Sequence, residues 1–422
     1  MVCYNGSMNF KTDVLVIGGG VIGVCSAYFL AQQGAQVMLI EKDEIASGCS
    51  YGNGGLIVPS HAVPLASPGA LGDGLRWLFD SESPFYIKLR MDAELIRWLT
   101  RFVWASREGH MLKSLPVLRD LLFASRALYE ELAKTVGFDF GFEGKGSLLV
   151  CLTKQALEKE RRETRLFEEF KIPVSMVNRD EALELEPALL PSIVGGVYYP
   201  RDGRIDPRRF VVGLAEKAQG LGAQLHTKTE AIGFESNSGR VTKVHTTRGE
   251  FTAGQIILAS GSWSPQVARA LRARIPIQPA KGYSITVENP TVTPRLPLLF
   301  SEARVVINPL GHALRIAGTL EFAGLDFSFN PRRVATMRNA SSEYLPGLAE
   351  AKVIEIWRGL RPCTPDGLPI VSRAKKLENV IVAAGHAMLG MSLGPITGKL
   401  VSQLARGEST QLDLTPLSAE RF

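Results

Sequence analysis

The chain has 422 residues, 45% of them hydrophobic and 21% charged, a composition typical of a soluble globular protein with room for two domains. Its formal net charge is +6, but the 48 lysines and arginines are interleaved with 42 acidic residues, so the pattern argues against nucleic-acid binding. The five cysteines are odd in number and lack paired spacing, which indicates neither a disulfide framework nor a metal site and favours a reducing cytoplasm.

A strand, a tight turn and a helix are predicted near the N-terminus. Residues 14–17 are a short apolar run, 18–23 are rich in glycine, and the pattern is helical from 24 to 30. This order is typical of a dinucleotide-binding unit, in which the glycines let the backbone approach a pyrophosphate at the helix N-terminus. A second apolar run, 36–40, ends in Glu41, a candidate acceptor for ribose hydroxyls. The predicted cofactor contacts here are Gly18, Gly20, Val21, Ile22, Gly23, Glu41 and Lys42.

A membrane span is the alternative interpretation of the same stretch. Residues 14–31 carry no charge and are about as long as a helix that crosses a bilayer. Three consecutive glycines near the start disfavour a helix there, and Asp13 and Glu41 bracket two strands better than one span. We therefore predict no membrane-spanning segment.

A loop of small residues follows at 45–55. Its four glycines allow backbone amides to come within hydrogen-bonding distance of a bulky ligand. Because the loop directly follows the nucleotide-binding unit, a second part of the cofactor site is favoured over an ordinary flexible loop. The predicted contacts are Ser50, Asn53, Gly54, Gly55 and Leu56.

The middle of the chain alternates helical and extended patterns. Apolar spacings predict helices between 75 and 134, whose stripes are assigned to core packing. A strand is predicted at 146–152, a charged helix at 154–170 and an edge strand at 196–200. Asp206 and Pro207 are typical of a helix start, and Gly222 of a helix end.

A second strand, turn and helix unit is predicted around residue 260. Strands at 224–226, 240–246 and 255–258 lead into a turn of small residues. We expect this turn to lie beside the first glycine turn in one parallel sheet. Its predicted cofactor contacts are Ala259, Ser260, Gly261 and Trp263.

The C-terminal third adds antiparallel strands and then returns to the parallel sheet. Residues 278–287 and 304–319 alternate as antiparallel strands of a second domain. The run at 353–357 leads into a segment with Arg361, and 380–384 reads as a buried parallel strand followed by a helix through Leu404.

These segments occur in the order of the D-amino-acid oxidase superfamily of flavoproteins, which the chain resembles over nearly its whole length. The resemblance rests on the glycine turn with Glu41, the 50–55 loop, the 259–263 turn, the Gly-Leu-Arg-Pro of 359–362 and Gly385-His386. Within the superfamily the chain is most similar to bacterial D-amino-acid dehydrogenases, through 64–69, 281–284 and 364–367.

The resemblance implies an α/β fold with two domains. A discontinuous Rossmann-type FAD-binding domain would comprise residues 1–75, 195–274 and 352–422, and an α+β substrate-binding domain with an antiparallel sheet would comprise 76–194 and 275–351. FAD is implied rather than NAD, which the first glycine turn alone leaves undecided. Cys363 lies closer to the 364–366 segment than the attachment cysteine of covalently flavinylated relatives, so noncovalent FAD is expected.

By resemblance, Arg361 clamps the substrate carboxylate, a role that suits the paired donors of a planar guanidinium. Tyr283 matches a position near the substrate and His386 one near the flavin ring, with core packing as the alternative for both. Backbone groups at the pyrimidine edge of the flavin are expected from Gly390, Met391, Ser392 and Leu393.

The resemblance implies oxidation of a D-amino acid, possible substrates including D-proline and hydroxyproline. A hydride would pass from the substrate Cα to flavin N5, and the electrons would then pass to a quinone or a carrier protein. A glycine- or sarcosine-type amine oxidase that uses oxygen stays open, as does a noncatalytic FAD subunit of a hetero-oligomer, against which Arg361 argues. Departures from the usual dehydrogenase pattern leave the identity of the substrate open; they are Gly52, Gly54, Met388, Met391 and Leu393. The oligomeric state is open as well. We expect a cytoplasmic protein whose membrane contact, if any, is peripheral at the inner face.

Overall fold

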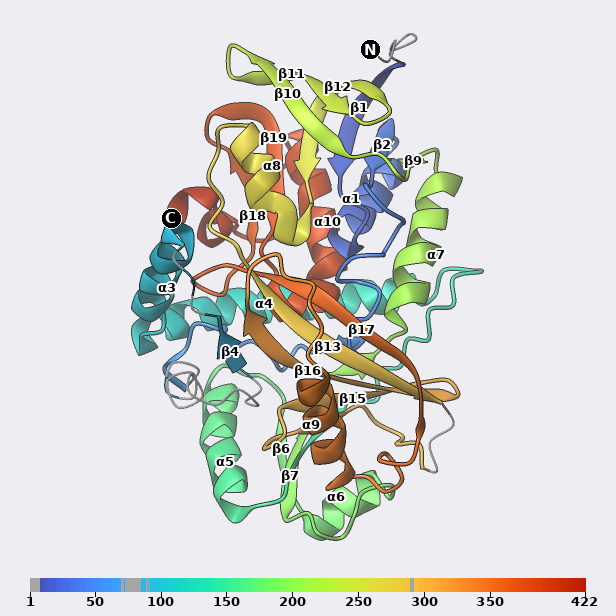
Figure 1. The fold of residues 1–422 in the computed structure, drawn as a ribbon, viewed down its shortest axis with the longest axis vertical. Coiled ribbons are helices and arrows are strands. Elements are labelled where there is room, and N and C mark those ends of the chain that lie inside the picture. Colours follow the sequence, from blue (N-terminus) through green and yellow to red (C-terminus); the bar gives the residue numbers. More distant parts are fainter. Residues whose placement is uncertain (1–7, 70–71, 73–84, 89, 91, 289–291) are drawn as a thin grey trace.

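The computed structural model contains two large sheets, one in the upper and one in the lower half of Figure 1. The structure describes residues 8–69, 72, 85–88, 90, 92–288 and 292–422. The part of the predicted helical pattern at 75–84 lies outside these residues. Among them, no helix is long and apolar enough to cross a membrane.

The upper sheet is built around parallel strands that come from separate parts of the chain. Its strand order is β10-β11-β12-β1-β2-β9, with β19 also beside β12 and β18 beside β19. The strands are β1 (Asn9–Ile17), β2 (Val37–Ile40), β9 (Gln224–His226), β10 (Ala231–Asn237), β11 (Arg240–Thr246), β12 (Gly249–Leu258), β18 (Ile370–Ala374) and β19 (Leu377–Ala384). Ile17 at the end of β1 is level with Ile40 on one side and Leu258 on the other, so the two predicted turns do lie side by side.

The lower sheet is mixed and mostly antiparallel. Its strand order is β17-β13-β16-β15-β14-β5-β7-β6, and β4 pairs with β16. The strands are β4 (Phe85–Ile87), β5 (Ser147–Cys151), β6 (Ser175–Asn178), β7 (Gly195–Tyr199), β13 (Gln278–Glu288), β14 (Leu298–Phe300), β15 (Val305–Leu310), β16 (Ala313–Phe322) and β17 (Lys352–Cys363). A short pair, β3 (Leu56–Ile57) and β8 (Gly203–Arg204), completes the described strands.

Helices cover the sheets and join them. They are α1 (Val21–Gln32), α3 (Ala93–Ala105), α4 (Glu108–Leu132), α5 (Lys154–Glu169), α6 (Arg179–Leu185), α7 (Pro207–Gly220), α8 (Ser264–Ala270), α9 (Pro331–Ser342) and α10 (Gly390–Arg406). The predicted start of α7 is confirmed, because the Asp206 side chain accepts hydrogen bonds from the Arg208 and Arg209 amides.

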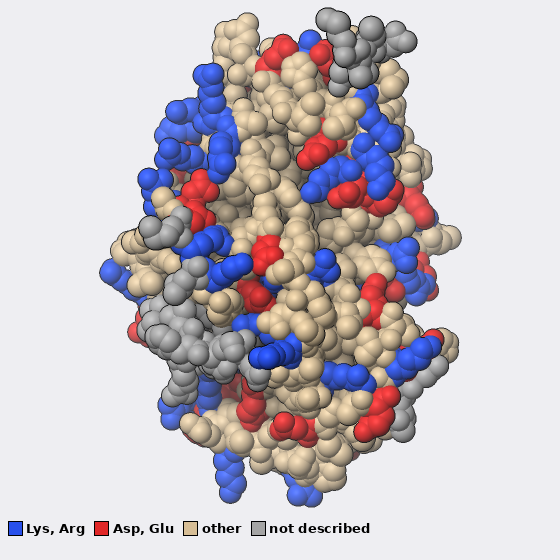
Figure 2. Space-filling view, in the orientation of Figure 1, with Lys and Arg blue, Asp and Glu red and all other residues tan. Residues whose placement is uncertain are grey.

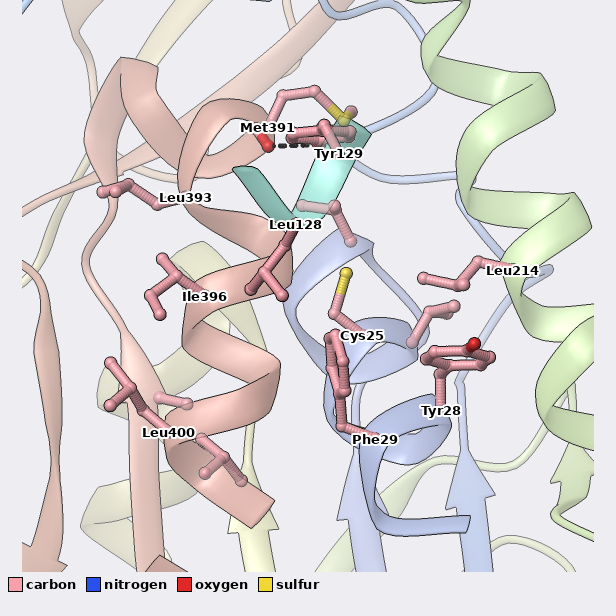
Figure 3. Packing of buried hydrophobic residues seen from close by; sticks show 14 of the residues in the cluster. Cys25, Tyr28, Phe29, Leu128, Tyr129, Leu214, Met391, Leu393, Ile396 and Leu400 are labelled. Carbon is pink, nitrogen blue, oxygen red and sulfur yellow. Dashed lines mark hydrogen bonds between the residues drawn. The ribbon is translucent and has the colours of Figure 1, made fainter. Parts of the chain in front are cut away.

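Helices α1, α4, α7 and α10 meet in the core behind the first glycine turn (Figure 3). An ideal Cβ at Gly398 would lie 2.5 Å from the Cys25 carbonyl carbon, so this glycine permits α10 to approach α1 closely. The Tyr129 hydroxyl of α4 donates to the Met391 carbonyl over 2.6 Å. This packing fixes the start of α10 relative to α1.

Three expectations need correction. The edge strand predicted at 196–200 is an interior strand, because β7 pairs with both β5 and β6. Gly196 permits the pairing with β5, since a Cβ at this position would clash with the Leu149 carbonyl oxygen. Strand β10, none of whose residues is buried, was not predicted. The run from 353 continues as a strand through Arg361 instead of ending before residue 358. The predicted FAD-binding segments 195–274 and 352–422 begin with β7 and β17, which belong to the lower sheet, and continue into strands of the upper sheet. Each segment therefore contributes to both sheets, and the division into two domains stays a prediction.

Candidate cofactor and substrate site

A cavity of about 810 Å³ lies between the carboxyl ends of β1, β2 and β12 and the strands β13 and β17 of the lower sheet. This volume lies within the range of roughly 300–1,000 Å³ for small-molecule sites. The cavity extends from the glycine turn to Arg361, so it touches both sheets. Ligands of open α/β sheets bind at this edge, where neighbouring crossovers leave a crevice.

Most of the predicted site residues line this one cavity. Those predicted to contact the cofactor and found in its wall are Gly18, Gly20, Val21, Ile22, Glu41, Lys42, Ser50, Asn53, Gly54, Ala259, Ser260, Gly261, Trp263, Gly390 and Met391. The three predicted catalytic residues, Arg361, Tyr283 and His386, line it as well. The structure thus brings together segments that are up to several hundred residues apart in sequence.

Five predicted cofactor contacts lie behind the wall instead: Gly23, Gly55, Leu56, Ser392 and Leu393. A Cβ at Gly23 would lie 1.8 Å from the Gly18 carbonyl oxygen, so this glycine serves the packing of α1 on the turn. The Ser392 hydroxyl donates to the Leu56 carbonyl over 3.1 Å, which ties α10 to the second loop. Leu393 is buried in the helical core.

Backbone hydrogen bonds fix the cofactor end of the cavity. Glu41 accepts from the Gly19 amide over 2.6 Å and from the Asp43 amide over 2.9 Å, one bond to each carboxylate oxygen. Each oxygen keeps acceptor capacity for a ribose hydroxyl. The Val21 amide donates to the Ser50 hydroxyl over 2.9 Å, so the second loop is held against the N-terminus of α1.

Glycines also keep this end open. Gly18 has a φ of +119°, and a Cβ there would lie 2.5 Å from the Ala259 carbonyl oxygen. Lys42 lies over the Trp263 ring, 3.9 Å from its centroid, so two predicted contacts also touch each other. The open backbone, the helix N-terminus and the fixed carboxylate together fit a dinucleotide with a pyrophosphate.

No carboxylate among the described residues forms an ion pair with the Arg361 guanidinium. Its Nη1 donates to the Thr319 carbonyl over 2.7 Å, and Gly282 makes room for it, since a Cβ there would lie 1.8 Å from Nη1. Burial lowers the pKa of Arg361, and burial also raises the pKa of the adjacent Cys49 and Cys363 thiols to about 12, so neither thiol neutralises it. The remaining guanidinium donors could bind an anion in the cavity.

Tyr283 and His386 are both tied to other groups. The Tyr283 side chain is buried, and its hydroxyl accepts from the Asn330 amide over 3.2 Å. His386 is 3% exposed, and its Nε2 lies 3.0 Å from the Thr397 hydroxyl. Burial lowers the pKa of His386 to about 3, so the ring is neutral at neutral pH. Roles for these side chains towards substrate stay predictions.

The buried histidine predicts acid sensitivity. In the unfolded chain His386 binds a proton near its ordinary pKa of 6.5, whereas in the folded protein it resists protonation down to about 3. Stability is therefore present above pH 6.5 and is lost as the pH falls towards 3, by about 1.4 kcal/mol per pH unit. As the pH is lowered through this range, the melting temperature of the native protein should fall more steeply than that of His386→Asn. The exposed His312→Asn variant is the control, and an unchanged slope in His386→Asn would contradict the assignment.

Several wall residues were not predicted from the sequence, among them Cys49, Thr229, Ala231, Ile232, Phe327, Trp357 and Gly359. The Trp357 indole lies between two glycines: a Cβ at Gly52 would be 2.1 Å from its Cδ2, and one at Gly359 would be 2.0 Å from its Cη2. Alternation along β17 places Trp357, Gly359 and Arg361 on one face. That alternation was readable from the sequence once this stretch was recognised as a strand.

The Gly52→Ala variant tests this packing. The added methyl group must displace the Trp357 indole or the loop, and overpacking of this kind costs about 1–3 kcal/mol. We expect a melting temperature several degrees below that of the native protein. Gly48→Ala in the same loop is the matched control, because a Cβ there meets no atom of the described residues within 4 Å. Equal melting temperatures for the two variants would refute the tight contact.

The fold and the cavity define a dinucleotide-binding protein of the Rossmann type. The chain belongs to the FAD dependent oxidoreductase (DAO) family, whose model matches residues 13–404. It is therefore an enzyme that uses FAD, and the predicted preference for FAD over NAD is confirmed. Noncovalent attachment of FAD stays a prediction. The position of Cys363, which is buried and lies outside the cavity wall, agrees with it.

Relatives of known name cover almost the whole chain. It is 30% identical over 419 residues to a D-amino acid dehydrogenase of Vibrio atlanticus (strain LGP32), covering 97% of this chain and 100% of the relative. It is 31% identical over 424 residues to a D-amino acid dehydrogenase of Cereibacter sphaeroides (strain ATCC 17029 / ATH 2.4.9), covering 97% and 95%.

Solved structures of the same fold include two enzymes with other names. A glycine oxidase from Geobacillus kaustophilus matches with a TM-score of 0.80 at 26% identity, over 98% of this chain and 99% of that one. An L-proline dehydrogenase from P. horikoshii matches with a TM-score of 0.76 at 22% identity, over 98% of each chain. The predicted α/β fold with a Rossmann-type cofactor site is confirmed.

Proposed function

We propose that this enzyme is an FAD-dependent dehydrogenase of D-amino acids. The observation that carries the proposal is the Arg361 guanidinium, which faces a cavity built for a dinucleotide and has no carboxylate partner among the described residues. A substrate carboxylate would complete its hydrogen bonds. The dehydrogenases of Vibrio and Cereibacter support this reading over 97% of the chain.

Arg361 would bind the carboxylate and hold the substrate Cα in a fixed orientation. The Trp357 indole beside it would limit the space for the substrate side chain and exclude water. FAD, when bound, supplies the two-electron acceptor for the Cα–H bond that this reaction breaks. Burial lowers the pKa of His386 to about 3, which makes its ring a weak base, and its Nε2 lies 3.0 Å from the Thr397 hydroxyl. The substrate amine would therefore bind in its deprotonated form without a proton acceptor from His386. The substrate leaves as an imine, which water hydrolyses to an oxo acid or which persists as a cyclic imine from a proline-type substrate.

The electrons would pass to a quinone or a carrier protein. This part of the proposal is supported by the word dehydrogenase in the names of the two relatives. The protein would work in the cytoplasm, where unpaired thiols such as the buried Cys25, Cys151 and Cys363 persist, and would touch the membrane only peripherally.

The second candidate is an amine oxidase of the glycine type that uses oxygen. The match to the Geobacillus kaustophilus glycine oxidase over nearly the whole chain favours it as the alternative. Reduction by substrate without air, followed by admission of air, separates the two. Rapid reoxidation with peroxide release would favour the oxidase, and slow reoxidation the dehydrogenase.

The substrate class is tested by screening D- and L-amino acids, prolines, glycine and sarcosine with an artificial dye as acceptor. We expect turnover with one or more D-amino acids and little with their L-enantiomers. Turnover restricted to glycine and sarcosine would replace the proposed function by the second candidate. No turnover and no flavin bleaching with any of them would favour a noncatalytic FAD subunit.

A further inference from the structure

Four polar side chains form a row across the lower sheet, on the adjacent strands β15, β16, β13 and β17. They are Asn308, Arg315, Thr286 and Glu355, and each is directly opposite the next in the strand pairing. Residues directly opposite each other in antiparallel strands carry their side chains on the same face of the sheet, so the four side chains lie side by side. We call these four residues the polar row.

Arg315 is the buried cation of the polar row. On the face shown in Figure 2, lysine and arginine side chains extend into solvent with acidic side chains between them. The Arg315 side chain, in contrast, is 9% exposed, and its Nη2 lies 3.5 Å from Oε2 of Glu355. Its Nε donates to the Thr286 hydroxyl over 3.3 Å, and this hydroxyl donates to Glu355 over 3.5 Å. These bonds hold the guanidinium in place and leave Nη1 for other acceptors.

The Nη1 group of Arg315 binds the loop at 50–55. It donates to the Tyr51 carbonyl over 3.1 Å and to the Asn53 carbonyl over 3.2 Å. Because the donor is charged, these hydrogen bonds are stronger than those between neutral groups. One side chain of the lower sheet thus holds two backbone carbonyls of a loop that lines the cavity.

Both ends of the polar row contact the same loop. Asn308 donates through Nδ2 to the Gly54 carbonyl over 2.8 Å. Gly55 has a φ of +74° and leaves room for this amide, since a Cβ there would lie 2.4 Å from Nδ2. At the other end, Glu355 raises the pKa of Tyr51 through a hydrogen bond with its hydroxyl. The polar row therefore holds three carbonyls and one side chain of the loop.

The bonds to the carbonyls determine where two loop amides point. In a trans peptide unit the carbonyl and the amide of the next residue point in opposite directions. The amides of Gly52 and Gly54 belong to the two peptide units that Arg315 holds, so both point away from the guanidinium. Both glycines line the cavity, and neither amide has a hydrogen-bond partner among the described residues. Two donors are therefore available to a ligand in the cavity.

We propose that Arg315 is a positioning residue for FAD, which holds the loop so that the Gly52 and Gly54 amides can donate to the cofactor. Arg315 lies outside the cavity wall and acts through the loop, not by contact with FAD. A loop that is held in its binding conformation before FAD arrives loses less conformational freedom on binding, which raises the affinity. FAD is the cofactor of the family, so this role does not depend on which substrate the enzyme oxidises.

The experiment titrates the apoproteins of the native enzyme and its variants with FAD and follows flavin fluorescence. We expect Arg315→Gln to weaken FAD binding on the order of tenfold, because the carbonyls lose their charged donor and the two amides lose their fixed direction. Arg315→Lys keeps a cation beside Glu355 but loses the planar fork, so it should recover part of the affinity. Circular dichroism checks that each apoprotein is folded.

Arg338→Gln is the matched control. Arg338 also donates to backbone carbonyls, those of Leu348 over 2.9 Å and Ala351 over 2.7 Å, but neither residue lines the cavity. Its replacement should lower the melting temperature of the apoprotein and leave the FAD affinity unchanged. Native FAD affinity in Arg315→Gln, or an equal loss of affinity in Arg338→Gln, would overturn the proposal. If Arg315→Gln did not fold, Arg315→Lys would decide, and native FAD affinity in that variant would overturn the proposal as well.

Discussion

Replacing Arg361 by alanine is expected to lower kcat/KM for the amino-acid substrate by at least tenfold to a hundredfold. The variant removes charge-assisted hydrogen bonds, each worth about 1.5–3 kcal/mol, from a site where no carboxylate of the described residues offsets the guanidinium. FAD content should change little, because the predicted cofactor contacts come from other segments.

Two further variants separate the role of Arg361 from a general loss of structure. Arg361→Lys keeps the charge but loses the planar fork, so we expect a lower rate of flavin reduction as well as weaker binding. Arg97→Ala, at an exposed position of α3, should behave as the native enzyme. A native rate of flavin reduction and native substrate affinity in Arg361→Ala would show that another group holds the carboxylate.

Glu41→Arg is expected to weaken FAD binding by at least on the order of tenfold. The substitution removes the acceptor of the Gly19 and Asp43 amides and the predicted ribose acceptor, and it places a positive charge among their N–H groups. Titration of the apoprotein with FAD, followed by flavin fluorescence, measures the change. The protein should remain folded by circular dichroism.

The control for this variant makes the same charge change elsewhere. Glu168→Arg on the exposed face of α5 should bind FAD with native affinity. If Glu41→Arg bound FAD as tightly as Glu168→Arg, the ribose assignment would be wrong.

Local sequence patterns were sufficient to predict the cofactor end of the cavity. The turn at Gly18 and the turn at Ala259 each follow an apolar strand, and parallel strands bring such turns to one edge. The acid Glu41 follows the neighbouring strand, so its place in the wall could be predicted without knowledge of the rest of the fold.

The substrate end depends on contacts that a single sequence does not reveal. The close approach of Trp357 to Gly52 joins residues some three hundred positions apart, and nothing in either neighbourhood indicates the other. Strand β10 also lines the cavity, through Ala231, Ile232 and Phe234, but none of its residues is buried, and Gly233 and the polar residues 235–237 weaken its strand signal in the sequence. The resemblance to a known family, and not the spacing of residues, directed attention to Arg361.

The most direct test of the central claim is flavin reduction in the isolated enzyme without air. The FAD-loaded protein is mixed in a stopped-flow instrument with a D-amino acid or with its L-enantiomer, and flavin absorbance is followed. We predict rapid, concentration-dependent bleaching by the D-enantiomer, none by the L-enantiomer, and a slower phase in Arg361→Lys. A flavin that dithionite reduces but that no amino acid bleaches would contradict the proposal that this cavity oxidises amino acids.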